Sequence, residues 1–584
     1  MFTYKISEIK FSSGQPIDTH SADVILIVGP NNSGKSRTLQ EIGRQLQGNI
    51  QNRLVTSNIQ IQQEGSRDDL INWLSKFYPI ITPSESNKNP YVHVNSASGK
   101  YHQLFLRENS TLPKQDHDML TKLRILSNLL LEGKWLTDSC ETKNIHLFKE
   151  GVAHPIHILQ KSLVSGAPQI IDEFSQAVFD AFGFHVIPQL PFGRQSTIKL
   201  KKGKEPENIV DRYSQEYVNA IDDLPNLTDE GSGVKAYIGI LQNTIIGQHK
   251  IVLIDEPELF LHPPQARRLG ETVARHATVN GQQIIAVTHS SDFVIGAVTG
   301  CKNVCIIRIE RDDKTNYISF IKPQDLSQLW NDPLLKSARA LRGLFHDGVI
   351  VCEGDSDVRF YESILRRLES KRDKPLDIYF VHGGGKQRIK SLVTAYKQLN
   401  VPVVTISDFD LLRRKDDVEV LYEELGGDFN NIQGKYNSAS NVLAKAGNIK
   451  APIDAINEVR QYLNNLEDKV SKGDKISGGD VDKVNISKVM ESARDWSNAK
   501  KLGIRCVKGG AKASVKDLLV ELEKLGLLIA EFGELESWND DIVALDKNDW
   551  LLQALEIINK DQNSFVEAEL FMEKVLNQLA SSKK

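Results

Sequence analysis

Cysteine is scarce in this sequence, and long runs of hydrophobic residues are missing. The 584 residues include 5 cysteines, which are scattered and form no pair with the spacing of a zinc site. So few cysteines argue against a disulfide-stapled secreted fold and predict a reducing, cytoplasmic environment. The longest apolar stretches, such as 24–28 and 251–254, are far shorter than the roughly 18 residues that span a bilayer. No membrane segment is therefore expected.

An excess of charge of one sign is also missing. The chain has 72 basic and 76 acidic residues, which gives a net charge of −4. Any attraction for nucleic acid must then come from a local basic patch, not from the overall field. With 40% hydrophobic and 25% charged residues, the composition excludes a disordered or collagen-like chain. At about 150 residues per domain, the length predicts roughly three to four domains.

Short runs of valine and isoleucine, each ending near Gly, Asp or Glu, predict an α/β fold with buried parallel strands. They fall in two regions of the chain. The first region contains the runs 24–28, 251–254 and 284–287, and the second contains 349–352, 378–381, 403–406 and 527–531. We accordingly expect two domains, residues 1–335 and residues 336–584.

Each region is interrupted by a long segment. Residues of about 50–225 interrupt the first region, and we expect them to be an insertion that is partly helical and serves as a dimerisation region. Residues of about 428–500 interrupt the second region, and apolar residues there recur at helical spacing. A helical insert is more plausible than a structureless loop of that length.

The run Gly29-Pro-Asn-Asn-Ser-Gly-Lys-Ser36 has the setting of a P-loop, because it follows an apolar strand and precedes a helical pattern. Glycines let phosphate oxygens reach backbone N–H groups, Lys35 neutralises phosphate charge, and the Ser36 hydroxyl is expected to hold Mg²⁺. The candidate ATP-binding residues of the loop are Gly29, Asn31, Asn32, Ser33, Gly34, Lys35 and Ser36. A chance glycine turn is the alternative.

Two acids end the strand at 251–254. Asp255 is the expected partner of Ser36 in holding Mg²⁺. Glu256 follows it directly and is the candidate base that polarises a water for attack on the γ-phosphate. Without the P-loop, the same run would be explained by a strand with acidic termination.

Three further motifs surround this acidic strand. Leu227–Gly233 precedes it, Leu261-His262-Pro263 follows it, and His289 ends the next strand. In this order they resemble the signature motif, D-loop and switch histidine of ABC-type and SMC-like ATPases, which bury ATP between two heads. The resemblance implies that Ser232 and Gly233 contact the γ-phosphate held by another subunit, so the chain would form a homodimer or homotetramer through this domain. A plain turn and a structural histidine are the alternatives.

A second group of acids ends strands of the later region. Glu353 follows 349–352, and Asp408 and Asp410 follow 403–406, where alternation places both on one side. Parallel strands would deliver all three to one sheet edge, where Mg²⁺ or Mn²⁺ relieves their repulsion. Two such cations would activate a water and stabilise the leaving oxygen of a phosphodiester. The alternative is a solvated edge with acidic loops.

This Glu…Asp-x-Asp pattern resembles the Toprim domain of topoisomerases, primases and certain nucleases. Further candidate metal ligands are Asp357, Glu534 and Glu536, and Lys508 and Lys512 are candidate cations that stabilise the reacting phosphate. For the two late glutamates and the two lysines, a plain surface role is an equal alternative.

Candidate DNA contacts are three basic runs, which would position a phosphate backbone without reading its sequence. They are Lys199–Lys204, Arg366–Arg372 and Arg413–Lys415. The last run directly follows Asp410. Each run is more often a solvated face.

An SMC-like ATPase followed by a Toprim domain resembles the OLD (overcoming lysogenization defect) family, and so does the late run Gly533–Glu536. The resemblance implies a metal-dependent DNA endonuclease regulated by ATP that acts in bacterial defence against phage. It leaves the partner open: a retron reverse transcriptase with its DNA or RNA, or another defence protein, as in Gabija-type systems. The alternative is an SMC-like DNA-repair or scaffolding ATPase whose Toprim domain does not cleave.

Two other functions of Toprim proteins are less compatible with this sequence. A topoisomerase would need a DNA-gate domain, and a primase would need a zinc-binding partner.

Overall fold

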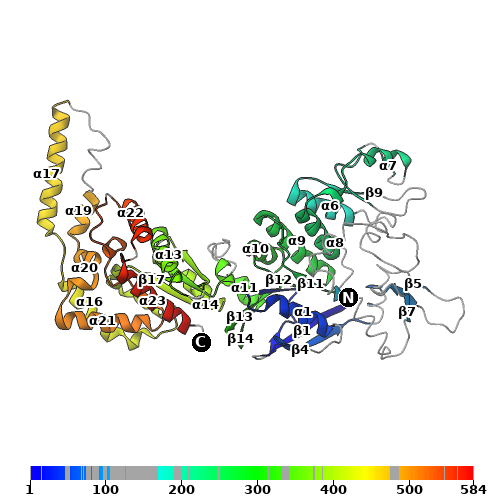
Figure 1. Cartoon of the computed structure of the whole chain (residues 1–584), viewed down its shortest axis with the longest axis horizontal. Coiled ribbons are helices and arrows are strands. Elements are labelled where there is room, and N and C mark those ends of the chain that lie inside the picture. The colour runs from blue at the N-terminus through cyan, green and yellow to red at the C-terminus, as the bar shows by residue number, and fades with distance from the viewer. Residues whose placement is uncertain are drawn as a thin grey trace. The chain divides into compact units, whose positions relative to one another are not determined.

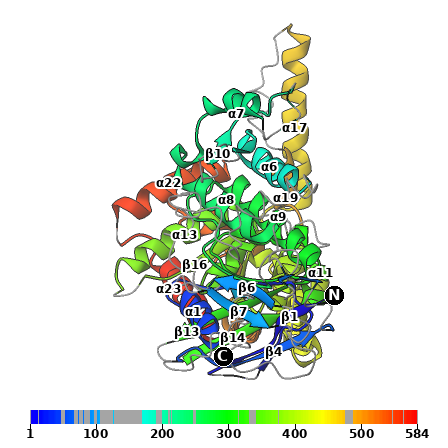
Figure 2. The same cartoon turned by 90° about the vertical axis from the view of Figure 1, so that its right-hand side faces the viewer.

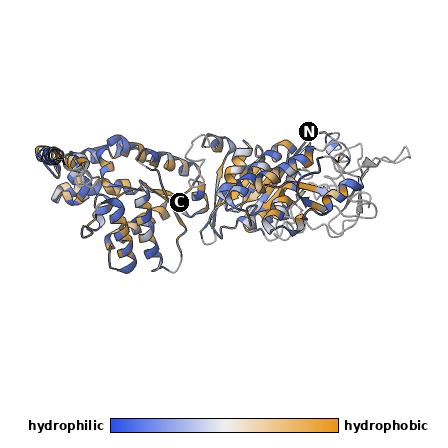
Figure 3. Cartoon of the chain, turned by 90° about the horizontal axis from the view of Figure 1, so that it is seen from above, coloured by the Kyte–Doolittle hydropathy of each residue, from blue (hydrophilic) through white to orange (hydrophobic). Residues whose placement is uncertain are grey.

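Parallel strands rich in valine and isoleucine form the centre of each of the two units into which the computed structural model divides, Met1–Phe345 and His346–Lys584 (Figure 1). The strands themselves are made mainly of hydrophobic residues, whereas the helices carry both hydrophobic and hydrophilic residues (Figure 3). The structure describes residues 2–12, 14, 16–46, 53–66, 69, 72–73, 80–81, 91–95, 101–105, 125–126, 169–189, 199–207, 209, 211, 214–245, 250–312, 315–329, 341–372, 375–384, 386–473, 486–544, 546–561 and 563–582. Within these ranges, a helix with the length and apolar character needed to cross a bilayer is absent.

A six-stranded sheet organises the first unit. Its spatial order is β14-β13-β3-β12-β11-β8, and every neighbouring pair is parallel except β13 and β14. The strands are β3 (Val24–Val28), β8 (Ile125–Leu126), β11 (Ile251–Asp255), β12 (Gln283–Val287), β13 (Val304–Asp312) and β14 (Thr315–Ile321). All five residues of β3 are buried, which explains its unbroken run of apolar residues.

Both faces of this sheet are covered. One face packs against α1 (Lys35–Leu46) and an antiparallel sheet of β1 (Thr3–Phe11), β2 (Pro16–Asp18) and β4 (Thr56–Glu64). Helices α8 (Ser232–Ile245), α9 (Pro263–Asn280) and α10 (Ser291–Gly300) lie on the other face (Figure 1). The remaining described elements are β5 (Ile80–Ile81), β6 (Tyr91–Asn95), β7 (Tyr101–Phe105), α6 (Gln169–Phe182), β9 (Val186–Gln189), β10 (Lys199–Lys202), α7 (Gln215–Asp222) and α11 (Pro323–Leu329).

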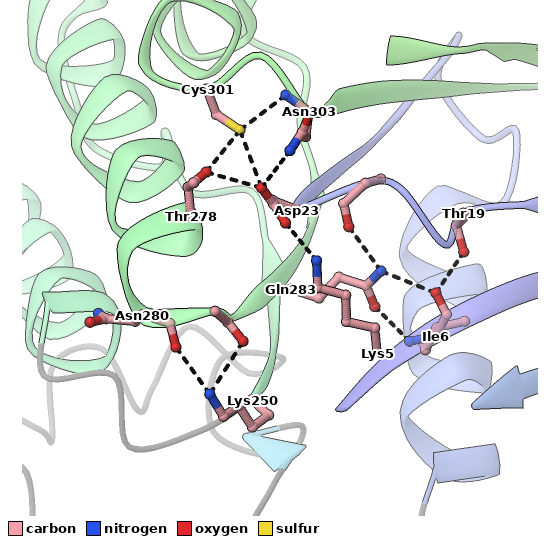
Figure 4. Close-up of polar contacts among 12 residues, drawn as sticks. Lys5, Ile6, Thr19, Asp23, Lys250, Thr278, Asn280, Gln283, Cys301 and Asn303 are labelled. Carbon is pink, nitrogen blue, oxygen red and sulfur yellow. Dashed lines mark hydrogen bonds and ion pairs between the residues drawn. The ribbon is translucent and has the colours of Figure 1, made fainter. Parts of the chain in front are cut away.

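A buried polar network joins β1 to the central sheet (Figure 4). The side-chain oxygen of Gln283 accepts from the Ile6 N–H at 2.8 Å, and its amide nitrogen donates to the carbonyls of Ile6 and Ala22. Asp23 pairs with Lys5 at 2.6 Å and accepts from Asn303 and Thr278. Because the polar atoms of these contacts find partners, the network fixes how the antiparallel sheet docks beside β3.

The second unit contains a four-stranded parallel sheet in the order β16-β15-β17-β18. Its strands are β15 (Gly348–Cys352), β16 (Ile378–His382), β17 (Val403–Ser407) and β18 (Leu527–Ile529). The surrounding helices are α13 (Asp355–Glu369), α14 (Lys386–Gln398), α15 (Lys415–Glu424), α21 (Gly509–Glu523), α22 (Lys547–Lys560) and α23 (Val566–Ser581). A cluster of aromatic rings, including Phe360, Trp538 and Trp550, fills the core beneath α13 and α22.

The prediction of an α/β fold with parallel sheets is confirmed, and a strand occupies each valine and isoleucine run named above. The last strand is shorter than expected and ends at Ile529, because the chain turns just after Ala530. The units divide after Phe345 and not after residue 335. The short turn Gly343–Phe345 belongs to the first unit, where the Leu344 carbonyl accepts from buried Arg308.

Both interruptions contain regular structure. Described residues of the first one form strands as well as the helices α6 and α7, and its residues 127–168 lie outside the described part. The described part of the second one is mainly helical. Its α-helices are α16 (Gln433–Lys445), α17 (Pro452–Ser471), α19 (Ile486–Ser492) and α20 (Ser497–Leu502).

Candidate active sites

The P-loop joins the central strand β3 to α1. Gly29 has φ +141°, and a side chain there would place its Cβ 2.0 Å from the Ile309 carbonyl oxygen, so only glycine fits. Asn32 (φ 61°) and Gly34 (φ 95°) also adopt positive φ. These turns bend the chain tightly between strand and helix, and the loop ends at the N-terminus of α1, where backbone N–H groups favour anions.

Lys35 is 4% exposed and is held by the loop itself. Its ammonium donates to the carbonyls of Gly29 at 3.0 Å and Pro30 at 2.5 Å. Phosphate binding would require this group to exchange a loop carbonyl for a phosphate oxygen. Such an exchange keeps the buried charge partnered throughout.

The structure brings Ser36 and Asp255 together, although they lie far apart in the sequence. The Ser36 hydroxyl donates to Asp255 Oδ1 at 3.1 Å. Burial raises the pKa of Asp255 to about 6; the neighbouring charge of Glu256 adds to the effect, and the hydrogen bond from Ser36 opposes it. Hydroxyl and carboxylate oxygens are the ligands that Mg²⁺ prefers, so the pair suits that ion. Glu256 follows with a positive φ of 50°.

A glutamate that the sequence analysis missed connects this site to His289, the candidate switch histidine. Glu258 accepts from the Thr288 hydroxyl at 2.7 Å and from the His289 N–H at 2.6 Å. Burial raises the pKa of Glu258, and these hydrogen bonds oppose that effect. The side chain therefore ties the turn after β11 to the end of β12 and fixes the backbone of exposed His289. The available signal was the third acid of the run Asp255-Glu-Pro-Glu258.

The signature residues begin α8. Ser232 is exposed at the N-terminus of this helix. Gly233 packs against the turn that follows β11, since a Cβ there would lie 2.4 Å from the Phe260 carbonyl oxygen. The predicted contact of Ser232 and Gly233 with the phosphate of a second copy stays a prediction.

The acidic residues of the second unit lie where the strand order of its sheet reverses. The chain runs from β15 outward to β16 and then returns to β17 on the other side of β15. Ligands of open α/β sheets bind in the crevice at the carboxyl ends of such strands. Glu353 follows β15 and Asp408 follows β17, and the Asp408 N–H donates to Glu353 Oε1 at 3.4 Å.

Asp408 is the electrostatic centre of this group. Burial raises the pKa of its carboxyl well above the usual range, and the charges of Glu353, Asp357 and Asp410 raise it further. Asp408 is thus close enough to each of the other three carboxylates to be repelled by them. Repulsion of this kind is relieved by protonation or by a cation.

A lysine that the sequence analysis missed lies within the group. Lys547, the first residue of α22, contacts Asp357 Oδ1 at 3.1 Å. Burial lowers the pKa of Lys547, but the charges of Asp357 and Asp408 outweigh this effect and raise it. Asp357 is 5% exposed, and its other oxygen accepts from the Gly354 N–H at 2.9 Å. No motif marks this lysine, because it begins an ordinary helix.

The loop after β18 reaches the same edge. The Phe409 N–H lies 3.5 Å from the Gly533 carbonyl oxygen, and Glu536 contributes to the raised pKa of Lys547. Glu534 is engaged elsewhere, in a 2.8 Å ion pair with Lys500. The structure therefore associates Glu536 with the acidic group, whereas Glu534 pairs with a lysine of the helical insert.

Lys508 and Lys512 form no ion pair or hydrogen bond with the described carboxylates. Lys508 is exposed and precedes α21, and Lys512 is half-buried on that helix. The cation beside the acidic group is Lys547 instead.

Two of the three basic runs have structural roles in part. Lys201 is 3% exposed and donates to the carbonyls of Asp222 and Leu224. Arg367 and Lys371 both pair with Glu569. Arg413 and Arg414, which follow Asp410, are exposed. The run beside the acidic group is therefore the one best placed to meet a phosphate backbone.

Oxygen atoms of carboxylates are hard ligands that suit Mg²⁺ and Mn²⁺, so the chemistry of this donor set fits the expected metal. Among the described residues, however, no group of three or more His, Cys, Asp or Glu side chains stands arranged to hold an ion. Metal binding would therefore require these side chains to rearrange, with Lys547 releasing Asp357.

Two family models match the chain. Residues 131–295 match an AAA domain family named for the AbiEii toxin of a type IV TA system. Residues 344–410 match the "Overcoming lysogenization defect protein-like, TOPRIM domain" family, and this match contains Glu353, Asp408 and Asp410. Residues 344–410 thus form an OLD-like Toprim domain. The prediction of an ATPase domain followed by an OLD-like Toprim domain is confirmed.

Two curated OLD-family relatives match part of the chain. The OLD nuclease of Thermus scotoductus is 30% identical over 169 residues, which cover 27% of this chain and 31% of the relative. The Old nuclease of Escherichia phage P2 is 23% identical over 168 residues, which cover 28% of each protein. The chain thus spans less than a third of either relative in these matches.

Solved structures of SMC heads also match this chain. An SMC head bound to the C-terminal winged-helix domain of ScpA covers 55% of this chain and 99% of its own length, with 11% identity and a TM-score of 0.34. An Smc head domain with an extended coiled coil from Pyrococcus furiosus covers 57% and 99%, with 12% identity and a TM-score of 0.30.

Proposed function

We propose that the chain is a metal-dependent DNA endonuclease whose activity is regulated by ATP. The observation that carries this proposal is the crowding of Glu353, Asp357, Asp408 and Asp410 at the strand-order reversal of the second sheet. Mutually repelling carboxylates cost stability, and such groups are typical of functional sites. The family match over the same strands supports a nuclease role.

In this proposal Glu353, Asp408 and Asp410 hold Mg²⁺ or Mn²⁺, and Asp357 and Glu536 assist them. Bound divalent ions supply the activation of a water and the stabilisation of the leaving oxygen. Lys547 then faces the reacting phosphate as a fixed positive charge, once a metal has taken its place beside the carboxylates. Arg413 and Arg414 bind the neighbouring backbone.

ATP binds at the P-loop of the first unit, with Lys35 on the phosphates and Ser36 and Asp255 on Mg²⁺. Glu256 acts as the base, and His289, positioned by Glu258, faces the γ-phosphate. Ser232 and Gly233 of a second copy complete the site, so that nucleotide controls the pairing of two ATPase domains and, through it, cutting. We further propose a cytoplasmic role in anti-phage defence, with a retron reverse transcriptase or another defence protein as partner.

One observation favours a second candidate function. Lys547 already neutralises Asp357, and the described carboxylates are not arranged to hold an ion. This would also suit a DNA-repair or scaffolding ATPase whose Toprim domain binds DNA without cutting it. A metal requirement for cleavage separates the two candidates.

The test is plasmid nicking by the full chain with Mg²⁺ or Mn²⁺, compared with EDTA. Asp408→Asn is expected to lower cutting by at least about 100-fold, because one lost charge-stabilising group in a site typically costs that much. Asp416→Asn, an exposed aspartate of α15, is the matched control and should cut normally. A wild-type chain that leaves DNA intact with either metal favours the scaffolding function, and equal cutting by Asp408→Asn rejects the assigned site.

A further inference from the structure

The helical insert of the second unit carries an exposed apolar stripe that the proposed nuclease function does not use. Figures 1 and 2 both show α17 extending away from the other helices of this unit. Ile456, Leu463 and Val470 of this helix are 42%, 50% and 56% exposed. Large apolar side chains on one exposed stripe usually mark an interaction surface.

The spacing of the stripe is that of a short coiled coil. Ile456, Leu463 and Val470 recur every seven residues, and half-buried Val459 and Leu466 lie between them at the second apolar position of the heptad. The pattern covers little more than two heptads, which is too short for a sequence alone to indicate a coiled coil. Exposure in the structure reveals that this pattern lacks a full partner among the described residues.

Charges beside the stripe select the kind of partner. Arg460 and Glu467 are exposed, lie one heptad apart on the same flank of the stripe, and form no ion pair within the described part of the chain. In an antiparallel pair of helices, each flank faces the same flank of the other helix. Arg460 of one copy would then meet Glu467 of the other, twice in each pair, because the arrangement has two-fold symmetry.

The same register aligns the apolar residues. With Arg460 opposite Glu467, Leu463 packs on Leu466 of the other copy and Val459 packs on Val470, which gives four apolar layers. A parallel pair places Arg460 opposite Ala455 and Glu467 opposite Tyr462, so that no opposite charges meet. We propose that α17 pairs with α17 of a second copy of this chain in an antiparallel helical dimer.

An interface this short is weak by itself, because stable protein interfaces bury roughly 1,200 Å² or more. Its effect becomes large when another interface already joins the copies, since the second contact is then intramolecular. The pair would therefore set how Toprim domains are arranged in a larger assembly.

Sedimentation velocity of the full chain over a range of concentrations tests this proposal. The wild type is expected to show a concentration-dependent association step, and Leu463→Asp should weaken that step at least about tenfold, since it buries a charge in two layers. Asp468→Arg, an exposed position on the outer face of α17, is the control and should match the wild type. Identical association of Leu463→Asp and the wild type would overturn the proposal.

A charge exchange tests the antiparallel register and keeps the proposal falsifiable if Leu463→Asp disturbs the helix. Arg460→Glu and Glu467→Arg should each weaken association several-fold, because like charges then meet. The double variant Arg460→Glu with Glu467→Arg should restore wild-type association within about twofold. A double variant that is weaker than either single variant would exclude this pairing and point to a different occupant of the stripe.

Discussion

Asp408 shows how a residue proposed to act in a functional site can lower the stability of the fold. The fold buries its carboxyl among Glu353, Asp357 and Asp410, and Lys547 offsets only part of the repulsion. The raised pKa means that the folded chain holds a proton on Asp408 at pH values where the unfolded chain has lost it. Without metal, folding stability must therefore fall as pH rises above the unfolded-state pKa of about 3.9.

Replacing Asp408 by asparagine removes this effect. In EDTA, we expect Asp408→Asn and the wild type to melt at the same temperature near pH 4. At neutral pH the variant should melt at a higher temperature, by about 2–4 °C for each kcal/mol of repulsion that the substitution removes. Scanning calorimetry of both proteins from pH 4 to pH 8 measures the difference. A difference that does not grow with pH would contradict the repulsion described here.

Burial raises the pKa of Asp255 to about 6, so this carboxyl titrates near neutral pH. Holding Mg²⁺ requires the ionised carboxylate, so Mg²⁺-ATP affinity should fall about tenfold for each pH unit below 6. A fluorescent ATP analogue titrated from pH 5 to pH 8 measures this dependence. ATP itself titrates in this range, and Asp255→Asn, which keeps only that contribution, is the control. An equally steep profile in the variant would assign the dependence to the nucleotide.

The candidate site residues that the sequence patterns predicted correctly as neighbours are those that lie just after strands. Ser36 and Asp255, and likewise Glu353 and Asp408, meet because parallel strands end at a common edge. Lys547 escaped prediction because it reaches the site from a helix start nearly 200 residues after Glu353, and helix packing, not a local motif, brings it there. Lys508 had a more suggestive glycine-rich setting, yet the fold leaves it exposed.

At the scale of elements, close packing between the start of α8 and the turn after β11 explains a glycine of the signature run. A Cβ at Gly233 would lie 2.4 Å from a backbone oxygen, whereas Gly231 has nothing within 4 Å of that position. Glycine is therefore required at 233 by this chain's own fold, apart from any contact with nucleotide.

We expect Gly233→Ala to destabilise the first unit by about 1–3 kcal/mol, the usual range for overpacking. Gly231→Ala should change stability by less than about 1 kcal/mol. Urea unfolding of both variants, followed by circular dichroism, measures the two effects. Equal stability of the two variants would show that the α8 turn adjusts without strain.

The sequence indicates where a helix forms more readily than it indicates what packs against that helix. Helical spacing correctly indicated α17, since Ile453, Ile456, Val459 and Leu463 recur at three to four residues. The same spacing would normally indicate a buried face, but Ile453 is 62% exposed. Periodicity reports that a face is apolar, and only the fold reveals whether something covers it.

At the scale of the whole molecule, each unit carries its own candidate site. The P-loop and Asp255 belong to the first unit, and the carboxylates with Lys547 belong to the second. Lys35→Ala should therefore abolish ATP binding without changing metal binding at the Toprim carboxylates, and Asp408→Asn should do the reverse. Binding of the fluorescent ATP analogue by Asp408→Asn at wild-type affinity is the expected result.

Calorimetric titration of Mn²⁺ into the full chain tests the central claim most directly. We expect the wild type and Lys35→Ala to take up Mn²⁺ and to release protons, because Asp408 must ionise to bind the ion. Asp408→Asn should lose most of this uptake. Repeating the titration in buffers of different ionisation enthalpy counts the protons. Identical uptake by Asp408→Asn and the wild type, or no uptake by the wild type, would contradict the assignment of these carboxylates as a metal site.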